Sequence, residues 1–138
     1  MDLTIDCEET WFSELEKAAF GEPNATKTME GRLAKEKYLK LKAGDHVRIH
    51  KSVNGIVLPD DFIDLEVTKV EKYSTFREMI EVEGLENILP GIQTIDDGVM
   101  IYRQWFSEKQ EKEFCVVAMH FKLLIKFHKI ENTIFKYV

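Results

Sequence analysis

The 138-residue chain has little of several features that would define a function class. It contains two cysteines, Cys7 and Cys115, without CxxC spacing, which excludes a disulfide scaffold. No apolar run approaches the roughly 18 residues that a membrane-spanning helix needs. The start, MDLTIDCEET, is acidic and lacks the basic and apolar regions of a secretory signal. We therefore expect an intracellular protein (cytoplasm or nucleus), not attached to a membrane, whose two thiols are free.

Motifs of the common enzyme classes are also missing. The sequence contains no GxxxxGK[ST], GxGxxG or GxSxG. The motifs that are typical of triphosphate-binding, dinucleotide-binding and serine-hydrolase sites are therefore missing. His46 and His50 are four residues apart, but on a strand they would lie about 13 Å apart, too far for one zinc ion. His120 and His128 have no partner at a known ligand spacing. The sequence predicts no metal and no cofactor.

The chain length suits a single domain spanning 1–138, and a hydrophobic fraction of 44% is that of a folded chain. The net charge of −6 hides a segregation along the sequence. Residues 25–51 contain eight basic and three acidic side chains, whereas residues 52–115 contain six basic and fourteen acidic ones. The basic segment is either a face for an anionic ligand or a lysine-rich, solvated strand edge.

Local patterns predict strands and helices without regular βα alternation. Apolar residues at three- and four-residue steps indicate a helix over 8–20 that Gly21 ends. Asn54-Gly55 predicts a hairpin turn, and Thr75 with Glu78 matches a capping box. We expect further strands at 3–5, 47–53, 62–70 and 114–124, helices at 76–84, 94–106 and 107–113, turns at 43–45 and 85–89, and one last strand returning along the sheet within 122–138.

This mixture favours an α+β domain built on a small, mainly antiparallel sheet or barrel with two or three helices. At helical spacing, the aromatic residues Trp11, Phe12, Trp105 and Phe106 are interpreted as core residues rather than stacking platforms. The roles of Tyr73 and Tyr102 stay open.

One short cluster, Lys27-x-x-Glu30-x-Arg32, could carry chemistry. Lys27 and Glu30 can face each other if the segment begins as a helical turn. Glu30 and Arg32 can share one face if it continues as a strand. A turn that runs into a strand would therefore bring the three head groups together, and Gly31 leaves room for a close approach. The alternative is an ordinary ion-pair cluster on the surface.

Three stretches in order resemble the ASCH family, whose domains are similar to the PUA fold of RNA-binding proteins. ATKTMEGRL (25–33) resembles the family signature GxKxxExR, with Ala25 in place of the glycine. LKAGDHVRI (41–49) is similar to the entry to a barrel strand. The third block comprises YSTFREMI (73–80), EGLENILPG (83–91) and YRQWFSE (102–108). The resemblance implies a PUA-like β-barrel with flanking helices and a cleft lined by the signature residues.

The resemblance also implies an RNA, nucleoside or related ligand. One branch of the family hydrolyses N4-acetylcytidine through a lysine, a threonine and a glutamate. Lys27 matches the lysine, Glu83 matches the glutamate across a gap, and Glu30 occupies the position of the threonine. Glu30 could there position a water for attack.

Two functions follow as hypotheses. The first is an RNA- or nucleotide-binding module, with a ligand site formed by Lys27, Thr28, Glu30, Arg32, Lys35 and Arg48. The second is an amidohydrolase acting on N4-acetylcytidine or a similar acylated nucleoside, with Lys27, Glu30 and Glu83 as catalytic residues. A protein-interaction module based on the acidic segment 52–115 is a third possibility without a motif. The oligomeric state stays open.

Overall fold

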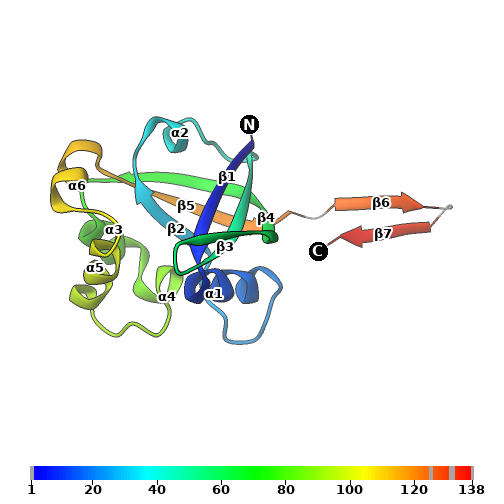
Figure 1. The fold of residues 1–138 in the computed structure, drawn as a ribbon, viewed down its shortest axis with the longest axis horizontal. Helices are drawn as coiled ribbons and strands as arrows, with labels where there is room; N and C mark the ends of the chain where they lie inside the picture. The colour runs from blue at the N-terminus through cyan, green and yellow to red at the C-terminus, as the bar shows by residue number, and fades with distance from the viewer. Residues whose placement is uncertain (1, 125, 131–132, 138) are drawn as a thin grey trace.

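The computed structural model describes residues 2–124, 126–130 and 133–137, with side-chain surroundings for 2–124. Within this part the chain forms an α+β fold (Figure 1). The strands are β1 (Asp2–Glu8), β2 (Met29–Leu33), β3 (His46–Val53), β4 (Ile56–Tyr73), β5 (Val116–Leu123), β6 (Lys126–Ile130) and β7 (Thr133–Tyr137). The helices are α1 (Glu9–Ala19), α2 (Glu36–Leu39), α3 (Phe76–Glu83), α4 (Leu85–Ile88), α5 (Ile95–Arg103) and α6 (Glu108–Phe114).

Five strands form one sheet in the order β1-β3-β4-β5-β2. β1 runs parallel to β3, and the other neighbouring pairs are antiparallel, which confirms the expected mainly antiparallel sheet. β1 and β2 are the two edges, and among the described strands no backbone pairing joins them. The hydrogen-bonded sheet is therefore not closed into a barrel.

The predicted hairpin connects β3 and β4. Asn54 and Gly55 have φ angles of 51° and 79°, the left-handed conformation that a two-residue type I′ turn requires at both positions. β4 continues for 18 residues, and its register against β5 shifts between Val67 and Lys69. This shift explains why the apolar alternation of the strand is only partial.

Side-chain caps begin four of the described helices, α1, α3, α5 and α6, and at α1 the Glu8 carboxylate accepts the N–H of Thr10. The hydroxyl of Thr75 accepts the N–H of Glu78, and that of Thr94 accepts the N–H of Asp97. The box predicted at Thr75 is displaced by one residue, because the Glu78 carboxylate accepts the N–H of Ser74. Ser107 and Gln110 form a reciprocal capping box at α6.

The expected count of two or three helices was too low: the described residues form six. Two of these, α2 and α4, are single turns of four residues that carry no long apolar period. The segment 85–89, expected as a turn, contains the helix α4. Among the described helices, none combines the length and the apolar character needed to cross a membrane.

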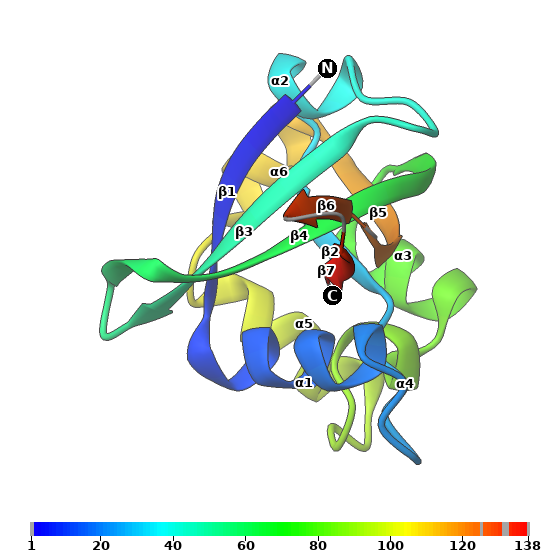
Figure 2. The ribbon, with the colours of Figure 1, turned by 90° about the vertical axis from the view of Figure 1, so that its right-hand side faces the viewer.

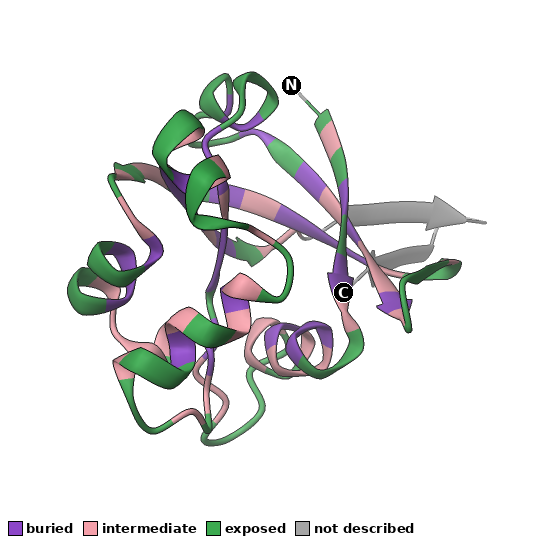
Figure 3. Ribbon diagram, turned by 60° about the vertical axis from the view of Figure 1, so that its left-hand side comes forward, coloured by how far each residue is buried: buried purple, intermediate pink, exposed green. Residues whose placement is uncertain are grey.

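The core lies between the sheet and the helices. Val116, Met119, Met29 and Met79 are completely buried, and they come from β5, β2 and α3. Figure 2 shows α1 and α4 together at one end of the sheet and α2 at the opposite end. In Figure 3 the helices turn exposed residues outward and the strands carry most of the buried positions. Helices thus lie at both ends of the sheet.

The expectation for the C-terminal segment needs correction. Instead of one strand returning along the sheet, β6 and β7 pair with each other in a separate antiparallel sheet (Figure 1). The pairing runs from Lys126 with Tyr137 to Ile130 with Thr133. Residues 125, 131, 132 and 138 lie outside the described part.

Candidate functional site

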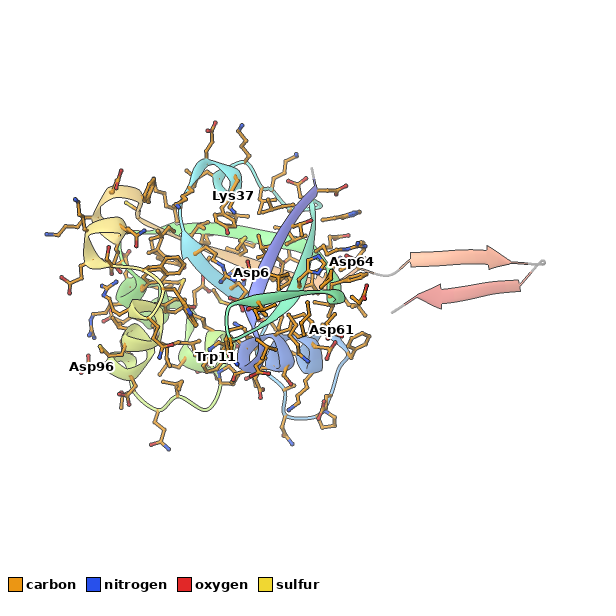
Figure 4. The ribbon with its side chains drawn as sticks, viewed as in Figure 1. Asp6, Trp11, Lys37, Asp61, Asp64 and Asp96 are labelled. Carbon is orange, nitrogen blue, oxygen red and sulfur yellow. The ribbon has the colours of Figure 1, made fainter. Side chains whose placement is uncertain are left out.

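A cavity of about 380 Å³ opens where the edge strands β1 and β2 meet the helices. This volume falls within the range of small-molecule sites. Figure 4 labels three residues on its border: Asp6 on β1, Trp11 at the start of α1, and Lys37 on α2. The cavity therefore spans the space between α1 and α2 along the seam between the two sheet edges.

The predicted convergence of the KxxExR side chains is present. Lys27 Nζ lies 2.7 Å from Glu30 Oε1, and Arg32 Nη1 lies 2.7 Å from Glu30 Oε2. Glu30 and Arg32 share a face of β2, as the spacing required, whereas Lys27 lies in the irregular segment before the strand and not on the helical turn that the sequence suggested. Glu30 and Arg32 line the cavity, whereas the lysine head group lies behind the carboxylate.

Lys27 is committed to the protein itself. Besides Glu30, its ammonium group donates to the carbonyl oxygens of Met29 at 2.7 Å and Ile88 at 2.6 Å. An ammonium has three N–H donors, so these three acceptors use all of them. The side chain is fully buried. Lys27 thus anchors Glu30 and ties β2 to α4.

The charges around Glu30 control its protonation. Burial by itself would raise the pKa of this carboxyl, but the positive charges of Lys27 and Arg32 outweigh burial and hold the pKa below its ordinary value. Burial likewise opposes the charge of Arg32, and the Glu30 carboxylate more than compensates, which raises the pKa of the guanidinium. Both groups are therefore ionised at neutral pH.

Side chains bridge the seam between β1 and β2. Arg32 Nη2 donates to the Asp6 carbonyl at 2.8 Å, and the Cys7 thiol donates to Glu30 Oε1 at 3.4 Å. Burial raises the pKa of Cys7, and the neighbouring Glu30 charge raises it further. The thiol is therefore a weak donor and packed group, as expected for a free, buried cysteine.

Gly31 lets neighbouring side chains approach the backbone of β2 closely, as its position in the motif suggested. A Cβ at this residue would lie 2.5 Å from Met79 Cε and 3.0 Å from the Tyr102 hydroxyl. The backbone of β2 is thus in direct contact with α3 and α5. Helix packing at this point sets the depth of the cavity behind Glu30 and Arg32.

The other predicted ligand residues are dispersed. Lys35 lines the cavity. Thr28 is exposed and borders a separate, smaller hollow. Arg48 forms two hydrogen bonds with Asp64 at 2.7 and 3.0 Å and lies over the Phe62 ring, outside the cavity lining. Figure 4 shows Asp64 well apart from Lys37.

Glu83 belongs to a different cluster. Its Oε2 accepts the Tyr73 hydroxyl at 2.7 Å and lies 3.0 Å from His120 Nε2. Burial would raise the pKa of Glu83, but these partners stabilise the carboxylate and lower it. The cavity lining does not include Glu83, so the structure separates it from Glu30.

Sequence reasoning did not assign Trp105 or Tyr102 to the ligand site, although both line the cavity. Trp105 was interpreted as core, yet 44% of its surface is exposed, whereas Trp11 and Phe12 are buried as expected. Trp105 follows the end of α5 at Arg103, so the helical period does not apply to it. The end of the amphipathic pattern was the available signal. Within residues 2–124, no three metal-ligating side chains form a group.

Comparisons with known proteins place the chain beside two solved structures. No known family matches its sequence, and no curated protein does. The crystal structure of the hypothetical protein PH0355 is 32% identical, with a TM-score of 0.72, and the match covers 90% of this chain and 100% of that one. The solution NMR structure of protein PF0455 from Pyrococcus furiosus is 31% identical, with a TM-score of 0.64, and covers 90% and 98%. At this identity over nearly their full lengths, the chain belongs to the same family as PH0355 and PF0455.

Proposed function

We propose that the protein is an intracellular RNA- or nucleotide-binding module whose cavity receives a base, built as an ASCH domain with a PUA-like barrel. The seam between β1 and β2 supports the barrel, because Arg32 and Cys7 link the two edges through side chains. The convergence of Lys27, Glu30 and Arg32 supports the ASCH assignment, because these residues form the signature.

The observation that carries the proposal is a half-exposed indole above a buried ion pair. Trp105 lines the same cavity as Glu30 and Arg32. An aromatic ring stacks on a base and contributes about 1–3 kcal/mol per base. A carboxylate and a guanidinium can bind the polar edge of that base. The cavity thus combines the apolar face and the polar edge that a base requires.

Glu30 and Arg32 keep some hydrogen-bonding capacity. Among the described residues, Arg32 donates to Glu30, Gly31 and Asp6, although a guanidinium has five N–H groups. Glu30 accepts from Lys27, Cys7 and Arg32, although a carboxylate has about four acceptor positions. One acceptor position and two donors are therefore left for a ligand.

Two lysines at the mouth of the cavity favour a ligand that carries a phosphate. Lys35 and Lys37 line it beside α2, and both side chains are exposed. Lys35 lies over the Phe114 ring and Lys37 over the Tyr38 ring, which holds their ammonium groups near the protein surface. A base on Trp105 would place its sugar-phosphate toward these lysines. This arrangement favours nucleotides and RNA over uncharged ligands.

The amidohydrolase alternative has less support. Its general base would be Lys27, but this ammonium donates to three acceptors and is shielded from the cavity. Glu83, its second carboxylate, lies in the cluster with Tyr73 and His120. Incubation of the pure protein with N4-acetylcytidine tests this alternative directly, and release of cytidine would favour it.

Titration with single-stranded RNA tests the binding proposal. We expect short oligonucleotides to quench the tryptophan fluorescence, with an affinity that falls as salt rises, because phosphate contacts release counterions. Trp105→Ala should weaken binding about 5- to 100-fold, as loss of one stacked base implies. Val82→Ala removes another exposed apolar side chain, outside the cavity, and should bind like the wild type.

Arg32→Ala separates the polar contacts from stacking. This variant should bind weakly while Arg77→Ala, which removes an exposed arginine from α3, binds normally. The absence of any RNA or nucleotide binding at low salt by the wild-type protein would overturn the proposal.

A further inference from the structure

The hydroxyl of Tyr102 lacks a hydrogen-bond partner among the described residues. The side chain is 2% exposed, and the hydroxyl oxygen is shielded from bulk solvent. The backbone N–H of Gly31 lies close to this oxygen, but that group is itself a donor, so the hydroxyl proton has no acceptor among the described residues. Native proteins pair nearly all buried hydroxyls, so an unpaired one requires an explanation.

Packing does not explain why this residue is a tyrosine. The Tyr102 ring stacks on Phe76 with a centroid distance of 4.3 Å and meets the Trp105 ring edge-on at 6.3 Å. Phenylalanine would make the same ring contacts without a buried polar atom. Because an unsatisfied hydroxyl destabilises the fold, its presence indicates a partner that is bound only in the liganded state.

The hydroxyl of Tyr102 lies close to the polar floor of the cavity. Tyr102 lines the cavity together with Glu30 and Arg32, and its oxygen is beside Gly31, which separates those two residues in sequence. The neighbouring atoms are the end of the Met79 side chain, an unbranched thioether that can repack around an entering group. An atom at the cavity floor can therefore reach the hydroxyl.

The phenol is suited to donate rather than accept. Burial raises its pKa well above the ordinary value, and the nearby Glu30 charge raises it further. The hydroxyl is thus protonated at neutral pH and requires an acceptor. Glu30 offers the opposite polarity, an acceptor for a ligand N–H.

We infer that Tyr102 is a specificity-determining residue whose hydroxyl donates a hydrogen bond to a carbonyl oxygen of the bound base. This inference rests on the proposed function and narrows it to bases that carry both a carbonyl oxygen and an N–H or amino donor on one edge. Cytosine, uracil and guanine carry both groups, whereas adenine has no carbonyl. The cavity should therefore prefer the first three to adenine.

Two measurements on Tyr102→Phe test the inference. Calorimetric titration should show that the wild type binds CMP, UMP and GMP more tightly than AMP. The variant should bind the carbonyl-bearing nucleotides about 3- to 10-fold more weakly than the wild type does, as loss of one hydrogen bond implies. Its affinity for AMP should be nearly unchanged. In the absence of nucleotide, its melting temperature should equal or exceed that of the wild type.

Tyr73→Phe is the matched control. Its hydroxyl has a partner, Glu83, outside the cavity, so this variant should melt lower than the wild type and bind nucleotides equally well. If Tyr102→Phe binds all four nucleotides like the wild type, or if it melts lower, the inference is overturned and the proposed function stands. If no nucleotide or RNA binds the wild type, both are overturned.

Discussion

Glu30 accepts hydrogen bonds from Lys27, Cys7 and Arg32 while 95% of its side chain is buried. A buried charge destabilises a fold unless partners surround it, and removing one partner is more harmful than removing the pair. The same geometry explains why Lys27 is inaccessible to a ligand: its side chain is fully buried, and three acceptors inside the protein use all of its N–H donors. The lysine therefore acts as a positioning residue for the carboxylate.

The substitution Lys27→Met tests this role. It leaves Glu30 with one cationic partner and leaves the carbonyl groups of Met29 and Ile88 without their donor. We expect the free energy of unfolding to fall by about 3 kcal/mol in urea denaturation. Lys17→Met removes an exposed pair with Glu14 and should change it by less than about 0.5 kcal/mol. Equal stabilities of the two variants would contradict a buried structural role.

At the scale of elements, β2 and α3 lie close together because residue 31 of β2 is a glycine and has no side chain between them. The backbone of Gly31 contacts Met79 on α3, and this contact holds the helix against the strand that carries Glu30 and Arg32. α3 is in turn oriented by its Thr75 cap and by Glu111, whose carboxylate accepts the N–H of Phe76 at 2.8 Å. The site geometry thus depends on helix packing as well as on the strand.

Gly31→Ala should disturb this approach. The new Cβ would lie 2.5 Å from Met79 Cε, so the flexible end of this buried side chain must shift, and we expect a cost at the lower end of overpacking, about 1 kcal/mol of unfolding free energy. A double-mutant cycle with Met79→Ala checks the cause. Because the shorter side chain removes the clash, adding Gly31→Ala to Met79→Ala should cost about 0.5–1 kcal/mol less than adding it to the wild type, roughly the coupling of residues in contact. Additive effects would show that the clash is not with Met79.

At the scale of the whole molecule, two half-buried or buried carboxylates link stability to pH. The pKa of Glu30 and that of Glu83 are both lowered in the folded protein, where partners outweigh burial. In the unfolded chain both carboxyls return to about 4.3. The stabilisation is therefore present above pH 4.3 and is lost as the pH falls through the folded-state values.

We expect the free energy of unfolding to be nearly constant between pH 7 and 5 and to decrease steeply below about pH 4. Urea denaturation at a series of pH values measures this profile. Glu30→Gln and Glu83→Gln should each flatten its acid limb, because the substituted group no longer takes up a proton. An acid limb unchanged in both variants would assign the pH dependence to other groups.

The local elements could be predicted because their causes lie within a few residues of one another. Asn54-Gly55 specifies a hairpin turn through its own φ angles, and Thr75 and Thr94 cap the helices that follow them. The meeting of Lys27, Glu30 and Arg32 is local in the same sense, because all three lie within six residues at the start of β2. Sequence alone therefore predicted the longer helices α1, α3, α5 and α6, the main strands and the charged floor of the site, but not the single-turn helices α2 and α4.

Only the tertiary structure decided what surrounds that floor. Trp105 and Tyr102 reach the cavity because α5 docks beside β2, and Glu83 is distant because α3 turns it toward Tyr73 and His120. These placements depend on contacts between residues far apart in the chain, which no local pattern records. The physical reason is that turn angles and caps act over a few residues, whereas a cavity is what remains after separate elements have packed their apolar faces together.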